Sequence, residues 1–169
     1  KGKINEDTAQ AAVLTYLNDF EEVANLDIIS GYIDSSEFNS ANYFFVGKTY
    51  SAPFRYFVRK MDISSVPGAV EGTSDGIITP NAWEDWQPID IALDSETVLP
   101  HTVRPMYYNE RLYVAWAEVS QTPTAELDGE LQDKYPVFVR MSYQKFDGTW
   151  SAPLLAFGGE VPSELLEYS

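Results

Sequence analysis

The residue pattern that comes nearest to a catalytic motif is Gly72-Thr73-Ser74-Asp75-Gly76, which has the glycine–serine–glycine spacing of a nucleophile elbow. Such an elbow exposes its serine on a sharp turn between a strand and a helix. Pro80 follows closely, and a proline inside a helix removes a hydrogen bond and clashes with the preceding turn. The segment is therefore expected to be a loop. The single histidine, His101, has no second histidine or cysteine with which to form a zinc site.

Pairs of carboxylates recur along the chain and could serve a glycosidase, whose two catalytic carboxyl groups lie about 5–9 Å apart. The pairs are Glu84-Asp85, Asp94 with Glu96, and Asp128 with Glu130. They fall on polar segments, where carboxylates are usually solvated, so surface residues are expected. A calcium loop needs alternating oxygen ligands around a glycine, and Asp128-Gly129-Glu130 is too short to form one.

Arginine is scarce, although guanidinium groups that converge on one site would suit a carboxylate-bearing sugar. Arg59 and Arg140 instead occupy corresponding places in two Phe-Val-Arg segments. That correspondence favours a structural role for both arginines in a repeated unit. The sequence contains no phosphate-binding loop, dinucleotide fingerprint or cysteine-based metal site, so it predicts no catalytic residue, cofactor or metal.

The chain is strongly acidic, with a formal net charge of -15 over 169 residues. That charge repels nucleic acid and anionic membranes, which excludes both as expected partners. No apolar run approaches the roughly 20 residues that a membrane-spanning helix needs. An apolar content of 44% excludes general disorder and provides the core of one domain. The first residues, Lys1-Gly2-Lys3, lack an initiator methionine or a signal peptide, which indicates a piece of a longer polypeptide.

Residues 7 to 25 are expected to form an N-terminal α-helix. Asn5 and Asp7 are suitable caps for its first turn. Apolar residues then recur at helical spacing and form one stripe, which consists of Val13, Tyr16, Leu17, Phe20 and Ala24. The polar residues beside this stripe are acidic, which favours docking against protein over binding to a membrane surface.

The rest of the chain has the aromatic and β-branched composition typical of strands. Strands are predicted at about 26–33, 42–47, 54–61, 86–91, 103–108, 111–117, 135–143 and 150–157. Asn109-Glu110 is short enough for a tight hairpin, and Asp147-Gly148 is a strong hairpin signal. The strand at 111–117 is apolar on both faces, so we place it in a sheet that is covered on both sides.

Two copies of one pattern are visible along the chain. Each copy contains a strand, a Phe-Val-Arg strand, and a strand in which a tryptophan precedes a proline. The matched segments are Tyr43–Val46 with Leu112–Ala115, Phe57–Arg59 with Phe138–Arg140, and Trp86–Ile89 with Trp150–Leu154. One tryptophan per antiparallel unit of about 40–50 residues is typical of propeller blades. Two unrelated hairpins in an open β-sandwich are the alternative.

The sequence therefore predicts a mainly β fold of antiparallel blade-like sheets with an N-terminal α-helix. The sheets would belong either to a propeller-like fragment or to an open β-sandwich, because known propellers usually need at least about four blades to close. Residues 1–35 are expected to hold the helix and an entry strand. Residues 36–169 are expected to hold the β domain, with blade-like repeats at about 43–93 and 103–157.

An ordered set of motifs resembles a known family. The set runs from Tyr16–Tyr32 through Tyr43–Lys48, Asn81–Trp86 and Arg104–Trp116 to Asp147–Trp150. It is similar to the neuraminidase-like region in the A subunit of Tc insecticidal toxin complexes, and it covers nearly the whole chain. The chain departs from true sialidases, which repeat a turn of the form S-x-D-x-G-x-T-W. Asp147-Gly148-Thr149-Trp150 lacks the spacer residues, which weighs against a hydrolase.

The resemblance implies a non-catalytic structural domain of a secreted, pore-forming toxin. It implies an A subunit that forms a homopentamer, whose shell encloses a translocation channel and opens on a pH change. A toxic enzyme carried by the B and C subunits would then be delivered to host cells. The implied partners are the other A-subunit protomers, the remaining domains of the same chain, and the B and C subunits. The resemblance implies no cofactor.

An acidic loop is the candidate pH-sensitive element of such a shell. Its carboxylates are Glu126, Asp128, Glu130 and Asp133. Carboxylates at a contact between protomers would change their mutual repulsion with pH. The single histidine argues against a histidine switch within these residues.

A carbohydrate-binding module is an alternative function, because exposed aromatic rings stack on sugars. Trp83 is the best candidate for a contact with a host glycan or a partner, since it lies at the end of a loop, and Trp86 and Trp150 are further candidates. A fragment of a glycosidase of the sialidase type is the remaining alternative, and it would depend on the paired carboxylates.

Overall fold

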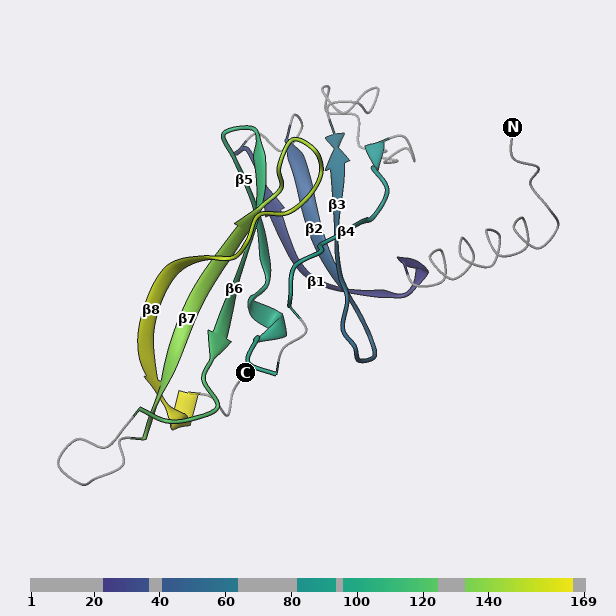
Figure 1. The fold of residues 1–169 in the computed structure, drawn as a ribbon. Coiled ribbons are helices and arrows are strands. Elements are labelled where there is room, and N and C mark those ends of the chain that lie inside the picture. The colour runs from purple at the N-terminus through teal and green to yellow at the C-terminus, as the bar shows by residue number, and fades with distance from the viewer. Residues whose placement is uncertain (1–22, 37–40, 64–81, 94–95, 125–132, 166–169) are drawn as a thin grey trace, which may run out of the picture.

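The computed structural model describes residues 23–36, 41–63, 82–93, 96–124 and 133–165. Two four-stranded antiparallel sheets make up this part of the chain (Figure 1). The first sheet contains β1 (Leu26–Ile33), β2 (Asn42–Thr49), β3 (Tyr56–Asp62) and β4 (Gln87–Pro88). The second contains β5 (Arg104–Tyr108), β6 (Arg111–Val119), β7 (Lys134–Tyr143) and β8 (Leu154–Pro162). The described 3₁₀ turns include η4 (Pro100–Thr102) and η5 (Ser163–Leu165).

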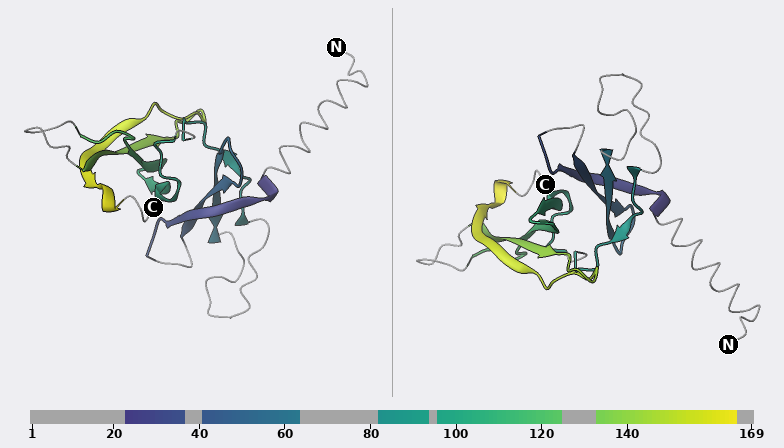
Figure 2. Two further views of the ribbon diagram at one scale, coloured as in Figure 1. Left: turned by 90° about the horizontal axis from the view of Figure 1, so that it is seen from below. Right: turned by 90° about the horizontal axis from the view of Figure 1, so that it is seen from above.

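The strands of each sheet lie side by side in the order of the sequence. The mainly β, antiparallel fold predicted from the sequence is therefore confirmed, and the described sheets do not close into a barrel. Figure 2 shows the two sheets as separate layers. The predicted N-terminal helix falls on residues 7–25, of which 7–22 lie outside the described residues, so the helix stays a prediction.

The core lies between the two sheets and is built by alternation along the strands. Val46 is paired with Val58 across β2 and β3, and Val114 is paired with Ser142 across β6 and β7. Paired residues point to the same face of a sheet, so every second residue of these strands faces the core. The buried cluster contains Phe44, Val46, Tyr56, Val58, Ile89, Leu93, Val98, Val103, Leu112, Val114, Trp116 and Trp150. Each large apolar side chain buried there stabilises the fold by about 1.5–3 kcal/mol.

The first strands of the two sheets, β1 and β5, lie next to each other (Figure 1). The Tyr32 hydroxyl donates a hydrogen bond to the carbonyl of Tyr107 at 3.2 Å, and the Arg104 guanidinium donates to the carbonyl of Ile29 at 3.2 Å. The rings of Phe44 and Tyr107 are stacked, with centroids 5.0 Å apart. Polar and aromatic contacts therefore fix the second sheet against the first along this edge.

The hairpin between β5 and β6 has the predicted tight turn. Asn109 and Glu110 both have positive φ angles, 49° and 59°. Two consecutive left-handed residues are the mark of a type I′ turn, whose twist matches that of the flanking strands. Asparagine tolerates this conformation well, which explains why Asn-Glu serves here without a glycine.

Two of the predicted strands begin or end elsewhere than expected. The strand predicted at 86–91 is reduced to Gln87–Pro88, because Pro88 has no amide hydrogen to donate. After Pro88 the chain turns, with hydrogen bonds from Ile91 N to the Ile89 carbonyl and from Leu93 N to the Ile91 carbonyl. The strand predicted at 150–157 begins at Leu154, after Pro153, and extends to Pro162. Trp150 forms only an isolated bridge with Gln144.

The letter-for-letter repeat does not extend to the orientation of its side chains. Arg59 lies opposite Phe45, on the face of the first sheet that points away from Val46 and the core. Arg140 lies opposite Trp116, on the core face of the second sheet. A one-residue difference in register moves a side chain to the other face of a sheet, so the two arginines occupy different environments.

Glu118 ties two elements of the second sheet together. Its carboxylate accepts hydrogen bonds from Trp116 Nε1 at 2.8 Å and from Arg140 Nε at 2.7 Å. We expect Glu118→Ala to lower the free energy of unfolding by about 1–3 kcal/mol, because it leaves two partly buried donors without their acceptor. Urea unfolding measures the change. Asp90→Ala, which removes an exposed carboxylate, is the control with an expected effect below about 0.5 kcal/mol, and equal effects would contradict the prediction.

Candidate functional site

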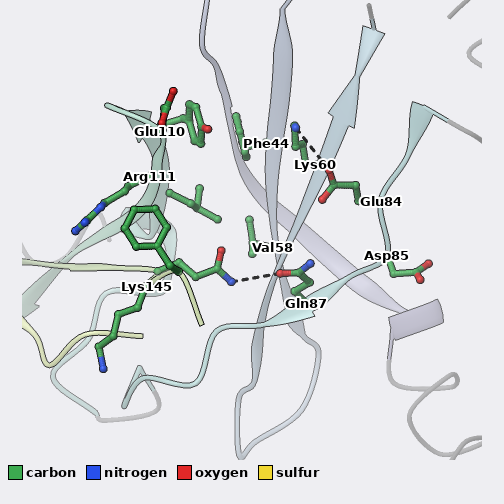
Figure 3. Close-up of a pocket in the computed structure, with 13 residues that line it drawn as sticks. Phe44, Val58, Lys60, Glu84, Asp85, Gln87, Glu110, Arg111 and Lys145 are labelled. Carbon is green, nitrogen blue, oxygen red and sulfur yellow. Dashed lines mark hydrogen bonds and ion pairs between the residues drawn. The ribbon is translucent and has the colours of Figure 1, made fainter. Parts of the chain in front are cut away.

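A cavity of about 260 Å³ opens between the two sheets, and its floor is apolar. Phe44, Val58 and Leu112, which belong to both sheets, form that floor. The remaining lining residues are Lys60, Glu84, Asp85, Gln87, Tyr107, Glu110, Arg111, Gln144, Lys145 and Phe146. Figure 3 shows most of these side chains around the opening. Charged residues from both halves of the chain thus line one cavity.

Several polar groups at this cavity are engaged with neighbouring side chains. Lys60 Nζ lies 3.5 Å from a carboxylate oxygen of Glu84, and Gln144 donates to the side-chain oxygen of Gln87 at 3.3 Å. Figure 3 shows the end of Arg111 directed away from Val58 and the floor. At this cavity Glu84 is therefore paired with a lysine of the first sheet.

Arg111 is held by aromatic rings at the rim of the cavity. Its guanidinium carbon lies 4.8 Å from the ring centroid of Phe146 and 5.2 Å from that of Tyr143. Phe146 is 87% exposed, so this contact sits at the surface. Contacts of this kind stabilise exposed sites by about 0.5–1 kcal/mol.

The carboxylates singled out in the sequence are scattered. Glu84 is paired with Lys60, and Glu96 accepts a hydrogen bond from Gln121 at 2.9 Å. Asp94, Asp128 and Glu130 lie outside the described residues, as does the Gly72–Gly76 segment. His101 is an exposed residue of η4. Within the described ranges, no three histidine, aspartate or glutamate side chains come together as metal ligands, and no helix is long and apolar enough to span a bilayer.

Trp83 and Trp86 lie around the Arg59 guanidinium on the outer face of the first sheet. The guanidinium carbon is 4.7 Å from the ring centroid of Trp83 and 5.8 Å from that of Trp86. Arg59 Nε donates to the carbonyl of Glu84 at 2.7 Å, and the Phe45 ring lies 5.7 Å from Trp83. Both indoles are only partly exposed, because they cover this arginine and the sheet beneath it.

Trp150 is buried between the sheets. Its Nε1 donates a hydrogen bond to the carbonyl of Pro88, at 3.3 Å, and so joins the end of the second sheet to the first. Of the three tryptophans proposed as glycan or partner contacts, it offers the least surface. The contact role of all three stays a prediction.

The acidic loop lies mostly outside the described residues, which include only Asp133 of its four carboxylates. The Asp133 carboxylate accepts a hydrogen bond from the Ser163 hydroxyl, and the Asp133 backbone carbonyl accepts one from Ser163 N at 3.1 Å. Asp133, which precedes β7, therefore links the start of this strand to η5. The pH-sensitive role of the loop, and the structural role of Arg59 and Arg140 as repeat positions, stay predictions.

The turn before Trp150 contains a carboxylate whose pKa is displaced. The pKa of Asp147 is lowered from its usual range, first by the hydroxyl of Thr149 and then by the backbone amide of Thr149. These groups donate to one Asp147 oxygen at 2.7 and 2.9 Å. Gly148 between them has φ of 84°, a conformation that glycine adopts without strain. The turn thus fixes the path of the chain into buried Trp150.

Replacing Thr149 with valine is expected to raise the pKa of Asp147 toward the usual range, because the largest stabilising donor is removed. Since the folded-state pKa is the lowered one, ionised Asp147 favours folding above the unfolded pKa, and that contribution is lost as pH falls through the folded pKa. Carboxyl NMR titration measures the shift. Thr122→Val is the matched control, and an unchanged Asp147 pKa in Thr149→Val would contradict the assignment.

A family model described as "Neuraminidase-like domain" matches residues 26–164. The chain belongs to this family. The matched range begins at the first residue of β1 and ends in η5, so this neuraminidase-like domain coincides with the two described sheets.

This neuraminidase-like domain is similar to a segment of a toxin subunit and to parts of two solved structures. Toxin subunit YenA2 of Yersinia entomophaga is 38% identical over 154 residues, which are 90% of this chain and 11% of that protein. The cryo-EM structure of Morganella morganii TcdA4 matches with a TM-score of 0.70 and 30% identity, over 95% of this chain and 6% of that one. The structure of Yersinia pseudotuberculosis TcaA-TcaB matches with a TM-score of 0.61 and 18% identity, over 96% and 8%, which shows the shared fold.

Sequence reasoning found the two sheets but missed the burial of Trp150 and the polar ties between elements. The links from Glu118 to Arg140 and from Gln87 to Gln144 join residues that are far apart in the chain. A signal was available only for the neighbouring bond from Trp116 to Glu118. Trp116 and Glu118 are two residues apart on a strand, so their side chains point to the same face.

Proposed function

We propose that the chain is a structural, non-catalytic domain of a pore-forming Tc toxin A subunit. The observation that carries this proposal is the 38% identity to Toxin subunit YenA2 over 90% of the chain. The arrangement at the inter-sheet cavity supports the non-catalytic part, because its Lys60–Glu84 and Gln87–Gln144 pairs satisfy one another. A family name that refers to neuraminidase describes a shared fold, and fold alone does not imply activity.

In this proposal the domain is part of a shell that encloses a translocation channel. The shell opens on a pH change and delivers a toxic enzyme to host cells. The partners are four further A-subunit protomers in a homopentamer, the other domains of the same polypeptide, and the B and C subunits. The chain spans 11% of the length of the curated relative that it matches, so these contacts involve surfaces beyond these residues. The complex acts as a secreted toxin.

The experiment is to measure the mass and shape of the A subunit that carries this chain, between about pH 5 and about pH 10, by light scattering and electron microscopy. We expect a pentamer whose shell opens within this range. The matched variant lacks residues 26–164 and is expected to lose the closed shell. A closed pentamer that forms equally well without the domain would overturn its structural role.

The acidic loop is the proposed source of pH sensitivity. Neutralising it with Glu126→Gln, Asp128→Asn, Glu130→Gln and Asp133→Asn removes repulsion between carboxylates, so the pH at which the shell opens is expected to differ from that of the wild type. Asp85→Asn with Glu110→Gln removes exposed carboxylates elsewhere and is the control. The same opening pH in the loop variant and the wild type would assign the sensor to another part of the subunit.

Two assays separate this proposal from the other functions that the sequence allows. A fluorogenic sialoside is expected to remain uncleaved, and turnover that is lost in Glu84→Gln would establish an enzyme. A glycan array tests for a carbohydrate-binding module. Binding that disappears in Trp83→Ala and persists in Phe146→Ala would favour that alternative.

A further inference from the structure

The chain contains three aspartate–glycine pairs, at 75–76, 128–129 and 147–148, of which the structure describes the last. In such a pair the glycine backbone nitrogen can attack the carboxyl carbon of the aspartate, because glycine has no side chain to hinder the approach. The new N–C bond expels the carboxyl hydroxyl, which leaves with the amide hydrogen as water, and a five-membered succinimide ring closes. Asp147-Gly148 therefore has the composition of a site that can modify itself.

Hydrolysis of such a ring takes up the water that its closure released. When water cleaves the bond between the ring nitrogen and the original backbone carbonyl, the chain continues through the aspartate side chain as isoaspartate. The product has the same mass as the starting chain, and its backbone is longer by one carbon. Water is the only co-reactant, and Asp147 and Gly148 are both exposed to it. Burial therefore does not prevent the reaction here.

The attacking nitrogen is engaged in the folded turn. Gly148 N donates a hydrogen bond to the carbonyl of Lys145 at 3.0 Å, and Gln144 Nε2 donates to the carbonyl of Gly148 at 3.3 Å. Lys145 N donates to the carbonyl of Thr149 at 2.7 Å and closes the same turn. Gly148 N must give up its bond before it can attack the Asp147 carboxyl carbon, so the reaction requires the turn to open.

The carboxyl group under attack is engaged as well. One Asp147 oxygen accepts hydrogen bonds from Thr149 Oγ1 at 2.7 Å and from Thr149 N at 2.9 Å, which draw the carboxylate toward the residue beyond Gly148. The Thr149 hydroxyl is also the largest cause of the lowered pKa of Asp147. Ring closure expels hydroxyl from the protonated carboxyl, and a lowered pKa reduces the protonated fraction at a given pH. Position and charge therefore act in the same direction.

We propose that Asp147-Gly148 is a site of isoaspartate formation that the folded turn suppresses, and that the Thr149 hydroxyl is the group that holds the reaction back. The reaction proceeds when the turn opens locally. Renewed hydrogen bonding between the Asp147 carboxylate and Thr149 returns the turn to its protected state.

Conversion at this site would affect the contact between the two sheets. An additional backbone carbon between residues 147 and 148 lengthens the turn that the bond from Lys145 N to the Thr149 carbonyl closes. Trp150 follows this turn directly, is buried, and donates to the carbonyl of Pro88 in the first sheet. Isoaspartate at position 147 is therefore expected to loosen the docking of Trp150.

Mass spectrometry of aged protein tests the suppression. The polypeptide that carries this chain is incubated at mildly acidic pH, folded and in urea, and isoaspartate is measured in the proteolytic peptide that contains residues 146–149. We expect Asp147 to convert at least about tenfold more slowly in the folded protein, because conversion waits for local opening. Equal rates in the folded and the unfolded protein would overturn the proposal.

Variants at position 149 test the hydroxyl. Thr149→Val is expected to accelerate conversion in the folded protein by roughly three- to tenfold, whereas Thr149→Ser keeps the donor and should stay near the wild-type rate. Thr122→Val is the matched control, since the Thr122 hydroxyl contacts Ser120 and not this turn. A wild-type rate in Thr149→Val, or the same acceleration in Thr149→Ser, would contradict the role of the hydroxyl.

The pairs at 75–76 and 128–129 provide an internal check on general unfolding of the variant. Their isoaspartate content is expected to be the same in Thr149→Val and in the wild type. An equal increase at all three pairs would contradict local protection by Thr149, because it would mean that the variant had lost its fold as a whole.

Hydrogen–deuterium exchange of a partly aged sample tests the consequence for the docking of Trp150. Peptides with aspartate and with isoaspartate at position 147 separate by chromatography, so both forms are compared in one sample. Faster exchange of the Ser151 amide is expected in the isoaspartate form, because its 2.9 Å bond to the Tyr143 carbonyl lies directly beyond the lengthened turn. Identical exchange in both forms would contradict this consequence.

Discussion

Replacing Trp116 with alanine is expected to lower the free energy of unfolding by about 3–5 kcal/mol. Trp116 is 1% exposed and lies in the cluster between the sheets. Alanine would leave a cavity, which the two sheets could fill only by shifting from their present packing. The substitution also removes the Nε1 donor from Glu118.

Urea unfolding followed by circular dichroism measures this effect. Phe146→Ala is the control, because Phe146 is the most exposed of the large apolar side chains described here, and the loss of its contact with Arg111 is expected to change stability by at most about 1 kcal/mol. A Trp116→Ala variant with a loss below 1 kcal/mol, by the same measurement, would show that the described core is not the one that holds the fold.

Trp150→Ala is expected to have the second-largest effect, about 3 kcal/mol, by loosening the contact between the sheets. Trp150 fills the core at the end of the second sheet, and its indole nitrogen donates to the Pro88 carbonyl in the first. Trp150→Phe keeps an aromatic ring and loses the donor, so a smaller loss of about 1 kcal/mol is expected.

The unfolding midpoints of the two variants can be compared if the unfolding free energy of both depends equally on denaturant concentration. The comparison then separates the contribution of packing from that of the hydrogen bond. Proteolysis provides a second readout, since sheets that no longer dock expose the segment between them. Equal losses in Trp150→Ala and Trp150→Phe would mean that the bond to Pro88, rather than the ring, carries the contact. No loss in either would contradict the described position of Trp150.

Much of the fold could be predicted from alternation. The strands at Arg104–Tyr108, Arg111–Val119 and Lys134–Tyr143 coincide with runs of aromatic and β-branched residues, because such side chains suit a pleated surface. The ends of strands were harder to predict. Pro88 and Pro153 interrupt pairing, and the local bonds around Ile89 and Ile91 redirect the chain in a way that composition does not reveal.

The candidate site could be predicted only in fragments. The shared Phe-Val-Arg letters suggested that Arg59 and Arg140 were equivalent, but the face of a side chain depends on register, which similar letters do not fix. The cavity draws Lys60 and Glu84 from the first sheet and Gln144 from beyond β7. Lys60 and Glu84 pair within the first half of the chain, whereas Gln144 reaches Gln87 only when the two sheets pack, so no local pattern could indicate that second contact.

The order of the strands has a consequence for how the chain folds. Each sheet is formed by consecutive strands, so its hairpins can close early through short-range contacts. Neither half has a complete core by itself, because Leu93, Val98 and Val103 from the connecting segment are buried together with residues of both sheets. The two halves should therefore fold as one cooperative unit with a single transition, and a chain cut between them would yield two fragments that are each largely unfolded.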